Sequence, residues 1–237
     1  YWMTKTPRGV LSDKLPILEG QNDENVTWSG DAFLMYTHTG THIDAFNHFC
    51  LGRNFATYGG FKADDYLGDR GWRVAGADCF PPIIARGILL DVASVKGADM
   101  LPSSYGISRT DIEEAARVQN VELRKGDVVL LRTGRMQAWP DPTKFGSEEP
   151  GLTLDGAMYL AEDKKAIVIG ADNLSLEQWP SSDPSNPVPV HSYLLVKRGV
   201  PILEVLMLEE LARDKVWEFA FIGASLKIRG ATGSPMR

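Results

Sequence analysis

Cysteine is scarce in this chain, since only Cys50 and Cys79 occur among its 237 residues. Two cysteines without CxxC spacing are too few for a disulfide framework, and such low usage is typical of proteins that fold in a reducing compartment. We therefore expect a cytoplasmic protein. The chain begins at Tyr1 rather than at a methionine, so we also expect that further residues precede it.

Long apolar runs and clusters of positive charge are missing as well. The apolar stretches at residues 83–85 and 87–90 are interrupted by Arg86 and Asp91, far short of the roughly 20 apolar residues that a membrane-spanning helix needs. The 25 Lys and Arg residues are outnumbered by 31 Asp and Glu residues, which gives a net charge of −6. Phosphate backbones are bound by clustered basic residues, so we expect neither a membrane nor a nucleic acid as partner, but a small-molecule substrate.

Several common catalytic motifs are also absent. The sequence contains no Gly-x-Ser-x-Gly nucleophile elbow, no HExxH zinc motif, no Gly-x-Gly-x-x-Gly and no P-loop. Ser225 and Ser234 have no neighbouring residues that would mark either of them as a nucleophile. Serine hydrolase, dinucleotide-binding and nucleotide-hydrolysing designs are therefore not indicated.

What the chain does contain is typical of a globular enzyme. Hydrophobic residues make up 43% and charged residues 24%, and this length allows one large domain with a sizeable core. Residues 1–30 are rich in Pro, Gly, Asn and Asp and are predicted to form an extended N-terminal arm. Residues 31–237 are predicted to form a single domain.

Apolar runs and amphipathic stretches alternate through this domain. Ser108 followed by Asp111 predicts a capped helix start. We predict strands at residues 31–36, 86–93, 128–131, 166–170, 201–206, 218–223 and 226–228 and helices at residues 108–120, 154–162, 190–198 and 208–213. This alternation indicates an α/β fold with a mixed β-sheet and flanking helices.

The chain has only four histidines, and three of them lie within residues 38–48, HTGTHIDAFNH, together with an aspartate. Imidazole nitrogens and carboxylate oxygens suit zinc or another borderline divalent metal. A straight strand would place His38 and His48 about 33 Å apart, so the segment has to bend to gather them. Gly40 is the natural place for that bend, because glycine accepts backbone conformations that other residues resist.

The pattern His38-x-Gly40-Thr41-His42-x-Asp44-x-x-x-His48 resembles the signature of the metal-dependent cyclase superfamily, which includes bacterial kynurenine formamidases (arylformamidases) and isatin hydrolases. Phe46 stands where that signature has proline. The resemblance implies a swivelling β/β/α, cyclase-like fold. It also implies homodimers or homotetramers in which the N-terminal arm reaches a neighbouring chain.

The resemblance further implies the metal ligands. In the resembled family, a histidine at the start of a late helix and a glutamate on the following strand supply the remaining ligands, and these match His191 and Glu204. His38, His42 and Asp44 would hold one divalent cation, Zn²⁺ or Mn²⁺, with His191 and Glu204 completing it or holding a second ion. A salt bridge is the alternative role for Glu204, because an acidic group in an apolar strand is costly to bury unpaired.

The implied reaction is hydrolysis of a small aryl formamide or cyclic amide, of the N-formylkynurenine or isatin type, by metal-activated water. We assign His48 as the general acid and base rather than as a ligand, with Glu177 or Asp172 as substitutes if His48 binds metal. Three aromatic residues are predicted to contact the substrate: Phe46, Tyr58 and Phe61. Trp139 is a further aromatic residue on which the choice of substrate would turn. Thr232 or Ser234 is also predicted to lie near the site.

Two alternatives remain open at this point. The same metal site could serve a cyclase or a lactone hydrolase that acts on an oxygen ester. The chain could also be a non-catalytic member that binds metal or ligand and has lost turnover.

Overall fold

The computed structural model describes residues 2–6, 8 and 25–237, and the chain divides into two compact units, Tyr1–Tyr36 and Thr37–Arg237. In the first unit, β1 (Trp2–Lys5) pairs antiparallel with β2 (Gly30–Ala32). Residues 1, 7 and 9–24 of the predicted arm lie outside the described residues. The strand predicted at residues 31–36 ends at Ala32, and Phe33 and Leu34 are exposed.

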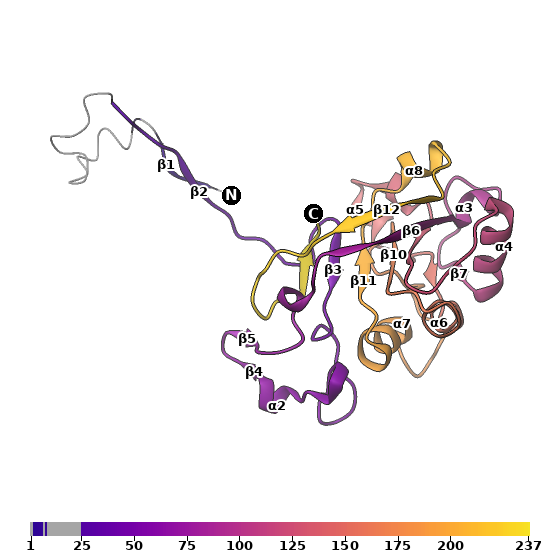
Figure 1. Ribbon diagram of the computed structural model, residues 1–237, viewed down its shortest axis with the longest axis horizontal. Coiled ribbons are helices and arrows are strands. Elements are labelled where there is room, and N and C mark those ends of the chain that lie inside the picture. Colours follow the sequence, from indigo (N-terminus) through magenta and orange to yellow (C-terminus); the bar gives the residue numbers. More distant parts are fainter. Residues whose placement is uncertain (1, 7, 9–24) are drawn as a thin grey trace. The chain divides into compact units, whose positions relative to one another are not determined.

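The second unit is organised around a seven-stranded mixed sheet with the strand order β12-β6-β8-β10-β11-β3-β13 (Figure 1). Its centre consists of four parallel strands: β6 (Ile83–Asp91), β8 (Val128–Arg132), β10 (Val168–Ala171) and β11 (Ile202–Glu204). The outer strands run antiparallel to their neighbours, and they are β12 (Glu218–Gly223), β3 (His42–Asp44) and β13 (Gly233–Pro235).

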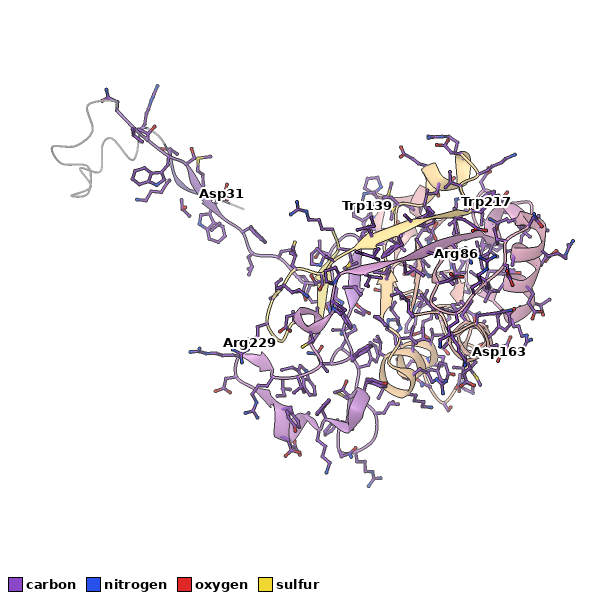
Figure 2. All side chains as sticks on the ribbon, in the orientation of Figure 1. Asp31, Arg86, Trp139, Asp163, Trp217 and Arg229 are labelled. Atoms are coloured by element: carbon purple, nitrogen blue, oxygen red, sulfur yellow. The ribbon has the colours of Figure 1, made fainter. Side chains whose placement is uncertain are left out.

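The central strands are buried on both faces, as their continuous apolar runs predict. Because successive side chains point to opposite faces, Ile88 and Leu90 of β6 join one hydrophobic cluster and Leu89 joins the other. The first cluster includes side chains of the helices α4 (Arg109–Gln119), α6 (Leu154–Met158) and α7 (Pro189–His191). On the second face, α8 (Glu209–Arg213) and Trp217 pack against the sheet (Figure 2).

The start of α4 shows how local sequence determines these boundaries. The Ser108 side chain accepts a hydrogen bond from the backbone of Asp111, and the Asp111 carboxylate accepts one from the backbone of Ser108. This reciprocal pair satisfies amide groups that have no partner inside the helix. At the other end, Asn120 adopts a left-handed conformation that stops the helix. The predicted helix 108–120 is therefore confirmed.

The predicted strands and helices of the sheet region are largely confirmed, with shifted ends. Two of the helices continue in π-helical form, α6 through Tyr159–Asp163 and α7 through Ser192–Arg198. The strand predicted at residues 86–93 starts at Ile83 and ends at Asp91, where the Asp91 carboxylate accepts from the backbone of Ser94 and begins α3 (Val92–Val95). The strand predicted at residues 226–228 is wrong, because the chain pairs with β3 only later, as β13.

Short elements fill the connections. They are α2 (Ala63–Tyr66), β4 (Leu67–Gly68), β5 (Gly71–Trp72), β7 (Gly106–Ile107), α5 (Pro142–Phe145) and β9 (Gly151–Leu152). In the part of the chain that the structure describes, no helix is both long enough and apolar enough to cross a membrane. The mixed α/β architecture with flanking helices confirms the predicted fold class.

Candidate metal centre

Strand β3 holds the centre of the histidine motif between two partner strands. Its pairing with β11 places Glu204 opposite His42. Because alternate residues of a strand share a face, His42 and Asp44 point the same way, while Ile43 is buried in the hydrophobic cluster on the opposite face. The sheet register therefore brings an early imidazole and a late carboxylate together.

A bend before β3 adds His38 to this group. Gly40 has a φ of +62°, the left-handed region that glycine enters without steric cost, so the predicted bend is confirmed. His38 Nδ1 lies 2.7 Å from Asp44 Oδ1. Its other ring nitrogen, Nε2, lies 3.0 Å from Thr232 Oγ1, which is the contact near the chain end that the sequence predicted.

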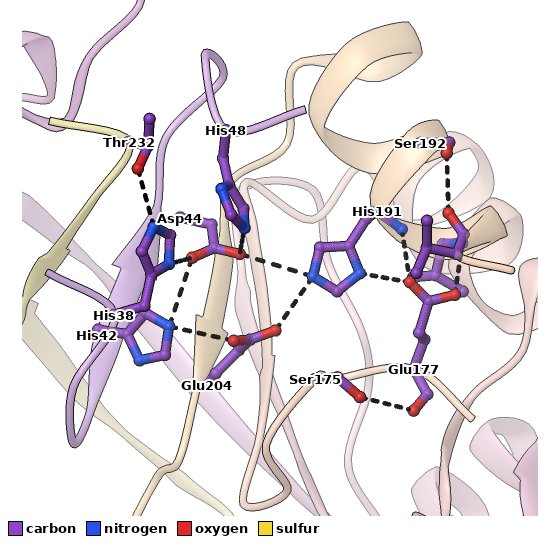
Figure 3. A network of polar contacts seen from close by, with 12 residues as sticks. His38, His42, Asp44, His48, Ser175, Glu177, His191, Ser192, Glu204 and Thr232 are labelled. Carbon is purple, nitrogen blue, oxygen red and sulfur yellow. Dashed lines mark hydrogen bonds and ion pairs between the residues drawn. The ribbon is translucent and has the colours of Figure 1, made fainter. Parts of the chain in front are cut away.

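His191 approaches from the first turn of α7 on the other side (Figure 3). Its Nε2 lies 3.2 Å from Glu204 Oε1 and 3.6 Å from Asp44 Oδ2. Its Nδ1 is hydrogen-bonded to Glu177, whose carboxylate also accepts from the backbone amides of Val190 and His191 at 3.1 Å. Glu177 thereby fixes the ring with Nε2 directed at the two carboxylates.

The five predicted ligands form two overlapping groups of donor atoms. One group contains His38, His42 and Asp44, and the other contains Asp44, His191 and Glu204. Within each group the ligand atoms lie within 4.8 Å of one another. Asp44 is shared by both groups, so the arrangement offers room for one cation or for two that share this carboxylate.

The hydrogen bonding of His42 fits a cation better than a simple polar cluster. Its Nδ1 donates to the Gly40 carbonyl at 2.8 Å, which leaves the lone pair of Nε2 facing Glu204 Oε2 at 3.1 Å and Asp44 Oδ1 at 3.4 Å. His42 Nε2 and Asp44 Oδ2 are both buried without a hydrogen-bond partner. A lone pair and carboxylate oxygens repel one another unless a positive charge lies between them.

The pKa shifts of the predicted ligands also indicate that this site favours a positive charge. Burial by itself lowers the pKa of His42, but the neighbouring carboxylates of Asp44 and Glu204 outweigh burial and raise that pKa to about 10. Burial is likewise outweighed at His191, where the surrounding carboxylates raise the pKa well above its usual range. Asp44 is buried too, yet the neighbouring imidazoles of His191 and His38 hold its pKa well below the usual range. The buried carboxylates thus stabilise a cation at this place.

His48 stands apart from both groups of donors. Its Nε2 is 3.8 Å from Asp44 Oδ2, and its ring centre is 4.1 Å from that of His38. Its side chain is 26% exposed, more than the other three histidines. Burial lowers the pKa of His48 to about 4, although Asp44 opposes that effect. The imidazole is therefore neutral near pH 7.

The other predicted acid–base and contact residues lie elsewhere. The Asp172 carboxylate accepts hydrogen bonds from Thr133 and from the Gly134 amide, and burial raises its pKa to about 6. Ser234 Oγ accepts from the Leu226 amide at 2.8 Å. Both side chains are thus engaged in holding loops together, and neither belongs to the two groups of metal donors.

The three aromatic residues predicted to contact the substrate pack mainly on one another and on their neighbours. The ring of Phe46 lies 5.1 Å from those of Tyr58 and Phe80. The ring centre of Phe61 lies 5.1 Å from that of Tyr66. Their role in substrate binding stays a prediction.

A pocket of about 550 Å³ opens beside the metal centre at His38. Residues 38–41 line it. The other lining residues are apolar, and they include Met136, Trp139, Phe145, Leu174 and Met207. The sequence singled out only Trp139 among these, because the others come from separate loops and carry no motif that would mark them.

Two known proteins are similar to this chain over most of its length. The chain is 28% identical over 207 residues to Cyclase-like protein 3 of Oryza sativa subsp. japonica, which covers 85% of this chain and 61% of the rice protein. The chain thus spans about three fifths of the length of that relative. It is 26% identical over 207 residues to isatin hydrolase of Roseibium aggregatum, covering 84% of this chain and 70% of that protein.

A solved structure and a family model complete the comparison. The crystal structure of a novel cyclase superposes with a TM-score of 0.82 at 29% identity, covering 99% of this chain and 77% of the other. The family model described as "Putative cyclase" matches residues 5–178, which is more than half of the chain. The predicted resemblance and the cyclase-like fold are confirmed, and the chain belongs to this cyclase family.

Proposed function

We propose that this protein is a metal-dependent hydrolase that opens a small aryl formamide or cyclic amide. The observation that carries the proposal is the pair of donor groups that share Asp44. Within these two donor groups, His42 Nε2 and Asp44 Oδ2 are buried without hydrogen-bond partners. The relative from Roseibium aggregatum, which bears the name isatin hydrolase, supports a cyclic amide as the substrate type.

The donor set suits Zn²⁺ or Mn²⁺, because three imidazole nitrogens and two carboxylates are neither purely soft nor purely hard ligands. His38, His42, Asp44, His191 and Glu204 would hold one such ion or two. When bound, the ion supplies Lewis acidity, which polarises a carbonyl and lowers the pKa of water to about 7.

The side chains of the protein provide the proton transfers. Hydrolysis adds one water across the C–N bond, so the carbonyl carbon gains oxygen and the leaving nitrogen gains a proton. His48 is placed beside Asp44 and partly exposed, and as a neutral imidazole it can take the proton from water and give it to the leaving nitrogen. His38 Nε2 donates to Thr232 Oγ1 at 3.0 Å, which leaves Nδ1, 2.7 Å from Asp44 Oδ1, as the nitrogen that would face the cation.

A cyclase or lactone hydrolase is the second candidate function. The same residues would act on an oxygen ester, and the name of the rice relative, Cyclase-like protein 3, favours this reading. A member that binds metal without turnover is the third. These alternatives differ in which bond is broken, so substrate kinetics separate them.

The test uses the purified chain loaded with Zn²⁺ or Mn²⁺ and compares kcat/KM for isatin, N-formylkynurenine and a simple lactone. We expect turnover of a nitrogen substrate, its loss after treatment with a chelator and its return with added metal. The His48→Ala variant should keep its metal content while kcat falls by about 10²- to 10⁴-fold. Turnover of the lactone alone would replace the proposal by the second candidate, and unchanged kcat in His48→Ala would remove His48 from its role.

A further inference from the structure

The pocket beside His38 differs from the metal centre in its chemistry. Its floor contains Met136 and Phe145, which are 6% and 4% exposed. Its rim contains Trp139, Leu174 and Met207, which are 59%, 43% and 67% exposed. Large apolar side chains from three separate loops thus surround one opening, and an exposed apolar surface of this kind commonly marks a binding site.

Charged side chains are missing from this wall. Among the described residues that line the pocket, none is lysine, arginine, aspartate or glutamate. Arg135 precedes the lining residue Met136, but it is buried and donates to the backbone carbonyls of Phe145 and Ser147. The Thr41 hydroxyl donates to the Val205 carbonyl at 2.7 Å. The Thr41 hydroxyl and the nearby Arg135 guanidinium are therefore engaged within the protein.

The pocket adjoins the metal centre at one of the predicted ligands, His38. His38 lines the pocket, and its Nδ1 lies 2.7 Å from the shared carboxylate of Asp44. A molecule seated against the apolar wall would therefore have one end near the metal donors. A volume of about 550 Å³ lies in the range of pockets that hold small organic ligands.

We propose that this pocket holds the uncharged aryl or alkyl part of the substrate, with the amide carbonyl directed past His38 to the metal donors. This inference rests on the proposed hydrolase function and narrows its substrate class. An ammonium or carboxylate group in the pocket would lose hydration without gaining a charged partner, which is costly. The pocket consequently favours neutral amides over N-formylkynurenine, which carries an α-ammonium and an α-carboxylate group.

The experiment compares two aryl formamides that share the same scissile bond. Formanilide is neutral, and N-formylkynurenine is zwitterionic. We expect the metal-loaded protein to hydrolyse formanilide with a kcat/KM higher by about tenfold or more. An equal or higher kcat/KM for N-formylkynurenine would overturn the inference while leaving the hydrolase function standing.

Two tryptophan variants test the wall directly. Trp139→Ala removes an exposed lining residue, so it should lower kcat/KM for formanilide by about tenfold without changing metal content. Trp179→Ala is the matched control, because Trp179 is 42% exposed and does not line the pocket. It should change kcat/KM by less than about twofold. Equal effects of the two variants would contradict the assignment of this wall.

Binding measured without turnover tests the pocket assignment separately from the proposed hydrolase function. Calorimetric titrations of the metal-loaded protein with oxindole, a neutral lactam, and with kynurenine should show tighter binding of oxindole, weakened in Trp139→Ala. If neither the two formamides nor isatin is hydrolysed but oxindole still binds in this way, the hydrolase function fails and the pocket assignment holds. Tighter binding of kynurenine would overturn the pocket assignment whatever the kinetics show.

Discussion

The buried Glu177 carboxylate orients the His191 ring toward the other predicted metal ligands. It is 1% exposed, and its carboxylate accepts from the amides of Val190 and His191 as well as from the His191 ring (Figure 3). With Nδ1 of His191 occupied in this way, Nε2 is left facing Asp44 and Glu204. Such partners of metal-binding histidines fix the ring orientation and the tautomer.

The Glu177→Gln variant should therefore bind Zn²⁺ about 10- to 100-fold more weakly than the wild type, because a neutral amide holds the imidazole less firmly. The measurement is a competitive titration of the metal-free protein against a chelator of known affinity. Glu122→Gln is the control, since Glu122 is exposed and pairs with Arg124 at 2.9 Å. Unchanged metal affinity in Glu177→Gln would show that Glu177 only supports the start of α7.

At this scale, the sequence predicts donor residues better than it predicts pocket residues. His38, His42 and Asp44 stand close together in the chain, and the resemblance supplied His191 and Glu204. The predicted role of Glu177 was that of a substitute proton carrier, whereas the structure shows it bonded to His191. Met136 and Leu174 belong to ordinary apolar loops, so only the folded chain reveals that they meet in one pocket.

Among the elements, β3 depends on a neighbour that the sequence did not predict. β13 contains Gly233, Ser234 and Pro235, a run without the branched or aromatic residues and the alternation that predict a strand. It pairs with β3 and places Gly233 opposite Asp44. The long apolar runs of β6 and β8, in contrast, predict buried strands without any knowledge of their partners.

The closeness of β13 to the metal centre gives a second prediction. A Cβ atom at Gly233 would lie 2.5 Å from His38 Cε1, so the imidazole has to move while the backbone stays. Gly233→Ala should therefore weaken metal binding by about tenfold or more with little change in the thermal unfolding midpoint. The measurement is metal titration alongside thermal unfolding.

Gly68→Ala serves as the control for this variant. Nothing lies within 4 Å of a Cβ built at Gly68, so the substitution adds a methyl group without displacing any side chain. Wild-type metal affinity in both variants would mean that His38 contributes little to the centre. A large fall in the unfolding midpoint of Gly233→Ala would instead assign the close contact to strand packing.

On the scale of the whole molecule, the centre exists only because the ends of the second unit's sequence meet in one sheet. β11 and β13 flank β3, which places Glu204 and Thr232 beside residues from the early motif. The alternation of apolar runs and amphipathic stretches predicts an α/β fold, but it does not specify this strand order. The register of β3 with β11 and β13 therefore brings residues from the two ends of this unit's sequence into one site.

We propose that a divalent cation is bound among five side chains: His38, His42, Asp44, His191 and Glu204. The most direct measurement is anomalous diffraction at the zinc or manganese absorption edge from crystals grown with that metal. We predict an anomalous peak among these five side chains, with His42 Nε2 and Asp44 as ligands, and its loss in crystals of Asp44→Asn. A peak confined to other residues, or a wild-type centre that stays without metal while its imidazoles and carboxylates bond only to one another, would contradict the claim.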